Sequence, residues 1–277
     1  MKRRVAAAIL WLLSSSAAYA AETDSAARRL LEDSNAGKPL VAHVVVALAD
    51  NEYQGIVPVP TALGDGDRPQ SNLYWGAMYG VKGFLKRSPE WRAVPLQASG
   101  DARVLERVLF RRDMVRDGKP VTVYLLAEAW QGRQIAASIS RFLEMTRGQH
   151  AETVRVDGRE IAAGGAAHLV AYVGHNGLMD FEVPALRPGA ESGAPRVAVV
   201  LACESDFFFS KLIRPHAAPL VTTASLMAPE AYVLEAVVAS WFGGASPGEV
   251  VESAAGAYGH YQKISIRSAR RIFDRDP

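Results

Sequence analysis

Five short apolar segments, each rich in Val, Leu and Ala, constrain the fold of this chain more than any other feature of its sequence. They are Val41–Ala49, Val121–Ala129, His168–Val173, Val197–Ala202 and Leu220–Ala224. A strand with one solvent-facing side alternates apolar and polar residues, whereas these segments show little polar alternation. The pattern therefore predicts strands that are buried on both faces, as in a parallel β-sheet.

Segments with helical spacing separate these apolar runs. The expected helices are Ala26–Glu32, Leu73–Lys86, Asp101–Arg116, Arg133–Arg147, Phe207–Ile213, Pro229–Phe242 and Pro247–Tyr258. Strands that alternate with helices imply right-handed crossovers and helices packed on the sheet. We therefore expect an α/β fold, a three-layer sandwich with a mainly parallel central sheet.

One connection between expected strands, Asn176–Arg196, lacks a clear helical pattern and is rich in proline and glycine. It is long enough for a parallel crossover, which needs about a dozen residues. A small hairpin around Met179–Val183 could lie within it. An antiparallel return of the chain is the competing interpretation.

The first twenty residues have the three-part pattern of a secretory signal peptide. The basic start Lys2–Arg4 precedes the apolar run Val5–Leu13, and Ala18-Tyr19-Ala20 is an A-x-A cleavage site. An uncleaved membrane anchor is disfavoured, because the apolar run is far shorter than the roughly 20 residues that cross a bilayer. We expect a secreted or periplasmic protein that is cleaved after Ala20.

Beyond the signal peptide, residues 1–20, we expect one globular domain. Residues 21–38 are a polar N-terminal segment, residues 39–262 the α/β domain, and residues 263–277 a basic, peripheral tail. The formal charge of +2 includes three signal-peptide cations and no signal-peptide acid, so the mature chain carries 2 − 3 = −1. This charge gives no reason to expect a nucleic-acid partner or an anionic membrane. The 49% hydrophobic content excludes a disordered chain.

Two chemically active side chains follow consecutive apolar segments. His175 comes just after Val173, and Cys203, the only cysteine, comes just after Ala202. Parallel strands end at the same edge of a sheet, about 4.8 Å apart, so the two side chains would emerge side by side if the strands are neighbours. A nearby imidazole activates a thiol as a nucleophile. Backbone N–H groups of Gly177 and Cys203 would hold an oxyanion, so we expect acyl transfer through a thioester.

These two motifs resemble those of the caspase–legumain–gingipain class of cysteine peptidases. His175 with Gly177 close by, followed by Ala202–Ser205 after the next strand, is similar to the histidine and nucleophile segments of that class. Residues 219–258 also resemble the CHAT branch, which includes separase-like peptidases. The family usually has glycine directly after the histidine, whereas Asn176 intervenes here.

The resemblance implies a caspase-like fold with Cys203 as the nucleophile and His175 as its partner. Legumain-type enzymes also have an asparagine after the first strand that steadies the histidine, and Asn51 lies at that place. Glu204 and Ser225 are the substrate-binding candidates. Glu204 either faces solvent or lines the pocket, where it would disfavour acidic substrates. The expected function is that of an exported cysteine hydrolase, a thiol peptidase acting on a peptide or protein substrate.

The same residues also have structural interpretations. A buried cysteine commonly acts as a small apolar side chain, and an asparagine after a strand commonly forms a turn. The sequence has no H-E-x-x-H zinc spacing and no glycine-rich phosphate loop, so no metal and no cofactor are expected. A non-catalytic caspase-like binding domain is the alternative function. A plain α/β ligand-binding protein with a core cysteine is the third.

Overall fold

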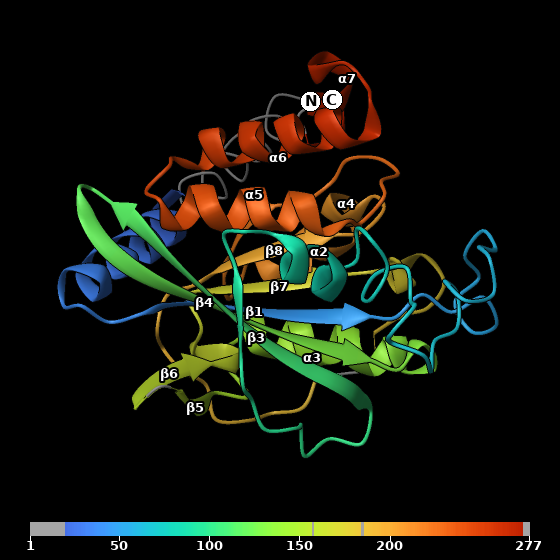
Figure 1. Cartoon of the computed structure of the whole chain (residues 1–277), viewed down its shortest axis with the longest axis horizontal. Coiled ribbons are helices and arrows are strands. Elements are labelled where there is room, and N and C mark those ends of the chain that lie inside the picture. Colours follow the sequence, from blue (N-terminus) through green and yellow to red (C-terminus); the bar gives the residue numbers. More distant parts are fainter. Residues whose placement is uncertain (1–19, 157, 184–185, 274–277) are drawn as a thin grey trace, which may run out of the picture.

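A seven-stranded sheet forms the centre of the computed structural model, which describes residues 20–156, 158–183 and 186–273 (Figure 1). The strand order is β2-β3-β4-β1-β7-β8-β9. Five strands are parallel: β1 (Leu40–Ala47), β4 (Lys119–Trp130), β7 (Leu169–Val173), β8 (Val197–Leu201) and β9 (Ala218–Val221). Two are antiparallel at one edge: β2 (Arg92–Val94) and β3 (Val104–Arg116). The predicted signal peptide lies outside the described residues except for Ala20.

The parallel strands are buried as their composition predicts. Every residue of β1, β7, β8 and β9 is buried. β1 lies in the middle of the sheet, between β4 and β7. Both faces of these strands therefore need apolar cover, which explains why their sequences lack polar alternation.

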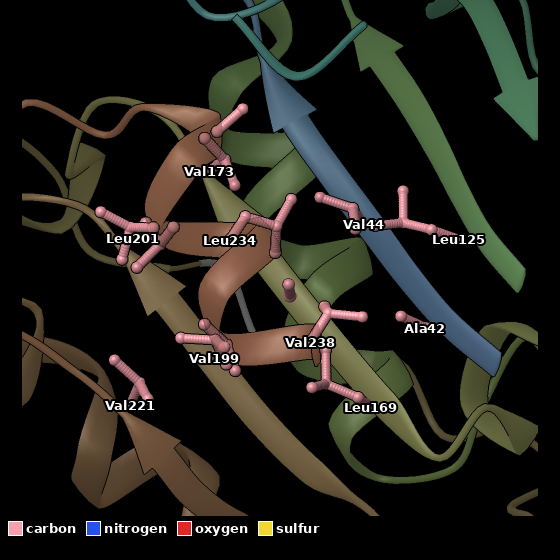
Figure 2. Close-up of a cluster of buried hydrophobic side chains, with 14 of the residues drawn as sticks. Ala42, Val44, Leu125, Leu169, Val173, Val199, Leu201, Val221, Leu234 and Val238 are labelled. Carbon is pink, nitrogen blue, oxygen red and sulfur yellow. The ribbon is translucent and has the colours of Figure 1, made fainter. Parts of the chain in front are cut away.

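Helices cover both faces of the sheet (Figure 1). One apolar cluster joins the sheet to helical residues 20–35, α2 (Val81–Arg87), α5 (Ala231–Phe242), α6 (Pro247–Gln262) and α7 (Ile266–Phe273). The other joins it to α3 (Ile135–Thr146) and α4 (Ser205–Ile213). Figure 2 shows Leu234 and Val238 of α5 packed over apolar side chains of the sheet, with Val238 next to Leu169. The mixed α/β class and the mainly parallel sheet are thereby confirmed.

The smaller elements lie between β4 and β8. A two-stranded antiparallel sheet consists of β5 (Glu152–Val156) and β6 (Arg159–Ala163). Three short 3-10 turns are η1 (Gly132–Gln134), η2 (Gly164–Ala166) and η3 (Gly177–Met179). Because β7 and β8 are parallel neighbours, Asn176–Arg196 is a parallel crossover and the antiparallel return is wrong. Around Met179–Val183 the described residues form η3 and coil, and the expected hairpin is absent.

The predicted helix Asp101–Arg116 is wrong, because this segment forms the long edge strand β3. It pairs antiparallel with β4, and Arg116 is opposite Lys119. The two residues between them, Asp117 and Gly118, have φ of 49° and 76°. Positive φ at both central positions is the geometry of a tight hairpin turn, for which Asp-Gly is a favoured sequence. The Asp-Gly sequence therefore indicates a β-hairpin, although the spacing of apolar residues in Asp101–Arg116 also fits a helix.

The predicted helix Leu73–Lys86 is shortened to α2, because the chain before it folds back on itself in turns. The buried Asn72 side chain accepts the N–H groups of Ala49 and Tyr74 and so competes with helical hydrogen bonding. A Cβ added at Gly76 would lie 2.1 Å from the carbonyl oxygen of Gln70, which shows how closely the two segments approach.

The two ends of the domain are more ordered than the sequence analysis expects. The N-terminal helix covers residues 20–35, beyond the predicted Ala26–Glu32. The basic tail contains α7, in which Ala269 and Phe273 are buried in the core, so this segment is not peripheral. In the described part of the chain, no helix is both long enough and apolar enough to cross a membrane.

Candidate active site

His175 and Cys203 leave neighbouring strand ends at the same edge of the sheet. β7 and β8 are parallel, and their last paired residues are Val173 and Leu201. The N–H of Gly174 donates to the carbonyl of Leu201 at 3.2 Å and extends the ladder by one residue. His175 and Cys203 each follow two positions after the last pair. The prediction that His175 and Cys203 lie at one edge requires adjacent parallel strands, and β7 and β8 meet this requirement.

Asn176 ties the two strand ends together. Its side chain is fully buried, and its Nδ2 donates to the carbonyl oxygen of Cys203 at 2.6 Å. Its Oδ1 accepts the N–H of Leu178 at 3.1 Å. On the other side, the hydroxyl of the buried Tyr172 donates to the carbonyl of His175 at 2.8 Å. The residue that separates the histidine from glycine in this chain thus joins the loop that carries His175 to the backbone of Cys203.

The imidazole of His175 has a carboxylate partner, Asp180. The distance from His175 Nε2 to Asp180 Oδ2 is 2.6 Å, and the two side chains are 15% and 48% exposed. A carboxylate at this distance holds the proton on Nε2 and leaves the lone pair on Nδ1. Among the described residues, Nδ1 has no hydrogen-bond partner. His175 is therefore oriented with one free nitrogen that can accept a proton.

The half-buried Cys203 thiol contacts the backbone of Met227. The N–H of Met227 lies 3.4 Å from Sγ, and Sγ lies 3.5 Å from the carbonyl oxygen of the same residue. The N–H would stabilise a thiolate, whereas the carbonyl accepts the proton of a neutral thiol. Within the described residues, no hydrogen bond joins Sγ to His175. A rotation of the thiol away from Met227 is thus needed before the two groups can exchange a proton.

A sharp turn connects Cys203 to α4. Glu204 has φ of 49°, a left-handed conformation that is uncommon for a residue with a side chain, and its N–H donates to the carbonyl of Ser225 at 3.0 Å. The next residue, Ser205, donates its hydroxyl to the carbonyl of Val200 at 3.0 Å. It also lies 3.1 Å from the hydroxyl of Thr223. The turn that presents the thiol is therefore braced against both β8 and the loop after β9.

The predicted oxyanion donors have different environments. The N–H of Gly177 donates to the carbonyl of His175 at 3.1 Å, so it is already occupied. The N–H of Cys203 donates to no acceptor in the part of the chain that the structure describes. Only the Cys203 amide remains free to bind an oxyanion in this conformation.

The other predicted site residues divide between the site and its supporting loop. The Asn51 side chain donates to the carbonyl of Val59 at 2.8 Å and accepts its N–H at 3.0 Å, which braces the loop after β1. The side chain that contacts His175 is Asp180, which the sequence analysis does not identify, and not the predicted Asn51. Glu204 and Ser225, the substrate-binding candidates, are brought together by their backbone hydrogen bond.

Two tyrosines form part of the surroundings of Cys203. Burial raises the pKa of Tyr74, and the nearby Cys203 and Glu230 raise it further. Burial also raises the pKa of Tyr258, whose hydroxyl accepts the N–H of Ala228 at 3.0 Å. Both phenols therefore stay neutral at physiological pH.

One cluster among the described residues has the spacing of a metal site, namely His43, Glu128 and Glu152. Its chemistry does not suit a metal. The N–H of Gly164 donates to His43 Nδ1 at 2.8 Å, so a neutral ring carries its proton on Nε2 and has no lone pair left for an ion. The guanidinium of Arg107 lies 3.2 Å from the Glu128 carboxylate and 2.6 Å from that of Glu152. The cluster is a buried ion-pair network that already contains its cation.

Comparisons of the chain with protein-family models, with curated proteins and with solved structures give no match in any of the three.

Proposed function

We propose that this protein is an exported cysteine hydrolase, a thiol peptidase with a caspase-like fold, whose nucleophile is Cys203 and whose proton carrier is His175. The observation that carries the proposal is the register of β7 and β8, which brings both residues to one edge of the sheet. The hydrogen bond from Asn176 to the carbonyl of Cys203 supports it by joining the two loops. The signal-peptide pattern in residues 1–20 is the basis for export.

In the proposed reaction, Cys203 transfers its thiol proton to Nδ1 of His175 and the sulfur attacks the carbonyl carbon of a peptide. The negative charge that develops on the carbonyl oxygen is bound by the free N–H of Cys203. The imidazolium then gives its proton to the leaving amine, and the C–N bond breaks to leave a thioester. His175 next takes a proton from water, whose oxygen attacks the thioester carbon. The C–S bond then breaks, the carboxylic acid leaves, and the imidazolium returns its proton to Sγ of Cys203.

Asp180 has a defined part in this reaction. Its carboxylate accepts the Nε2 proton of His175 at 2.6 Å and keeps Nδ1 as the basic nitrogen. The same carboxylate stabilises the imidazolium that forms when the thiol loses its proton. Positioned acid–base groups of this kind contribute about 10²–10⁴-fold to reaction rates. Asp180→Asn is therefore expected to reduce turnover without changing the fold.

Alkylation of the single cysteine tests the proposal. The mature protein is treated with iodoacetamide at neutral pH, and modification is followed by intact mass, which is unambiguous because Cys203 is the only thiol. We expect Cys203 to react faster than free cysteine, and His175→Ala to remove this excess. Unfolded protein in denaturant serves as the control for intrinsic reactivity. An unreactive Cys203 in the folded protein would count against the hydrolase.

A non-catalytic binding domain is the second candidate, and one observation favours it. Cys203 Sγ donates to the carbonyl of Met227 and accepts the N–H of the same residue. Both contacts suit a neutral thiol with a structural role. In that case Cys203→Ala leaves folding and every partner interaction unchanged. Loss of a hydrolytic activity in Cys203→Ala would exclude this candidate.

A further inference from the structure

The carboxyl-terminal helix α7 and the turn that precedes it carry positive charge only. Residues 263–273 contain Lys263, Arg267, Arg270 and Arg271 and no Asp or Glu. These four side chains, called the basic patch below, are all exposed. The whole chain has 31 basic and 29 acidic residues, so its net charge conceals this local excess.

The core anchors α7 in such a way that its basic side faces away from the protein. Ala269 and Phe273 are buried in the core. At 3.6 residues per turn, Arg267, Arg270 and Arg271 lie within an arc of about 100° on the other side of the helix. Figure 1 shows α7 at one end of the molecule, beyond α6 and away from the sheet. A large, flat partner can therefore reach the basic patch.

Contacts within the protein account for only one of these cations. Arg270 is paired with Glu252 of α6 at 2.8 Å. Lys263, Arg267 and Arg271 have neither an ion-pair nor a hydrogen-bond partner for their side chains among the described residues. The helix dipole does not explain Arg267 either, because this residue lies in the first turn of α7, where the dipole favours an acidic side chain. These three cations are therefore available to a partner outside the chain.

Two exposed isoleucines lie among the cations. Ile264 directly follows Lys263 and is 38% exposed, and Ile266 directly precedes Arg267 and is 43% exposed. Single exposed apolar residues are normal on a protein surface. Basic and aliphatic side chains together, however, are typical of segments that lie on an anionic membrane surface. Sites for single-stranded nucleic acid instead combine cations with aromatic side chains on which bases stack. The composition of this surface therefore favours lipid over nucleic acid.

We propose that the basic patch and the two isoleucines bind the folded protein to the surface of a bilayer that contains anionic lipid. The phosphate groups of the lipids meet Lys263, Arg267 and Arg271, and Ile264 and Ile266 lie at the level of the headgroups. Each cation near such a surface raises the affinity roughly fivefold. This binding is peripheral and needs no membrane-crossing helix. It does not depend on the proposed hydrolase function.

Sedimentation with lipid vesicles tests the proposal. The mature protein is mixed with sucrose-loaded vesicles of phosphatidylcholine, either pure or with about 30% phosphatidylglycerol, and the bound fraction is measured in the pellet. We expect binding to the anionic vesicles only. We also expect this binding to weaken in about 1 M NaCl, where the screening length falls to about 3 Å. No binding to the anionic vesicles, or equal binding to both kinds of vesicle, would overturn the proposal.

Two double variants with the same charge change locate the contact. Arg267→Gln with Arg271→Gln removes two unpaired cations of the basic patch and should weaken binding roughly 25-fold, at about fivefold for each. Arg155→Gln with Arg159→Gln is the matched control, because both arginines are exposed on the β5–β6 sheet, far from α7 (Figure 1). The control should bind as the wild type does. An equal effect of both double variants would assign the binding to net charge and reject the basic patch.

Ile266→Ser and a competing polyanion distinguish lipid from other partners. Replacing Ile266 should reduce the affinity for the anionic vesicles several-fold and leave the dependence on salt unchanged, because only apolar contact is lost. Thermal unfolding of each variant checks that the fold is retained. A DNA duplex at equal phosphate concentration should not displace the protein from the vesicles. If it does, or if Ile266→Ser binds as tightly as the wild type, the basic patch is a general polyanion surface and the lipid proposal is wrong.

Discussion

Replacing Asn176 with alanine should destabilise the protein and disturb the candidate site together. The side chain is fully buried and makes two hydrogen bonds, one to the carbonyl of Cys203 and one from the N–H of Leu178. Each lost bond costs about 1 kcal/mol, and a buried partner that remains unsatisfied costs about 1–3 kcal/mol. The sum predicts a loss of about 3–5 kcal/mol in the free energy of unfolding for Asn176→Ala.

Urea unfolding followed by circular dichroism measures this loss, with an unchanged m-value as evidence that the change lies in stability. Asn176→Asp separates the two bonds, since it keeps the acceptor for Leu178 and removes the donor to Cys203. The alkylation rate of Cys203 in the same variants reports on the site. A destabilisation below about 0.5 kcal/mol, the range of ordinary surface substitutions, would refute the idea that Asn176 joins the two strand ends.

Three further predictions concern the rest of the molecule. Burial alone would raise the pKa of Glu128, but His43 and Arg107 outweigh it and lower this pKa to about 2. The ionised Glu128 carboxylate therefore stabilises the folded protein at neutral pH, and this stabilisation is lost as pH falls from 4.5, its pKa in the unfolded chain, toward 2. The urea midpoint should therefore drop less across this pH range in Glu128→Gln than in the wild type. Gly76→Ala should cost about 1–3 kcal/mol by thermal unfolding, since its Cβ would meet a backbone oxygen at 2.1 Å. Phe273→Ala should cost about 3–5 kcal/mol in urea unfolding, and a silent change would show that the tail is peripheral after all.

The buried parallel strands were predictable because their sequences carry a strong signal. Val41–Ala49 and Val197–Ala202 contain β-branched and small apolar residues throughout, and β1 and β8 begin and end within two residues of these limits. The edge strand β3 was missed because it is half exposed and mixes charged with apolar residues, so that its spacing fits a helix as well. The Asp117-Gly118 turn was the better guide.

The candidate site was predictable in its strand ends but not in its contacts. The positions of His175 and Cys203 follow from where two apolar runs stop, which is a local property of the sequence. The partners Asp180, Asn176 and Met227 depend on the paths of three loops that carry no periodic signal. A carboxylate five residues after His175 was visible in the sequence, but nothing local shows that the loop turns back toward the ring.

The position of Cys203 Sγ in a crystal of the protein bound to a peptide aldehyde tests the central claim most directly. The account predicts that Sγ has left the Met227 backbone, is bonded to the aldehyde carbon, and lies about 3–4 Å from Nδ1 of His175. It also predicts that Asp180 still contacts Nε2. An unmodified sulfur still in contact with Met227, with the imidazole directed away from it, would contradict the account.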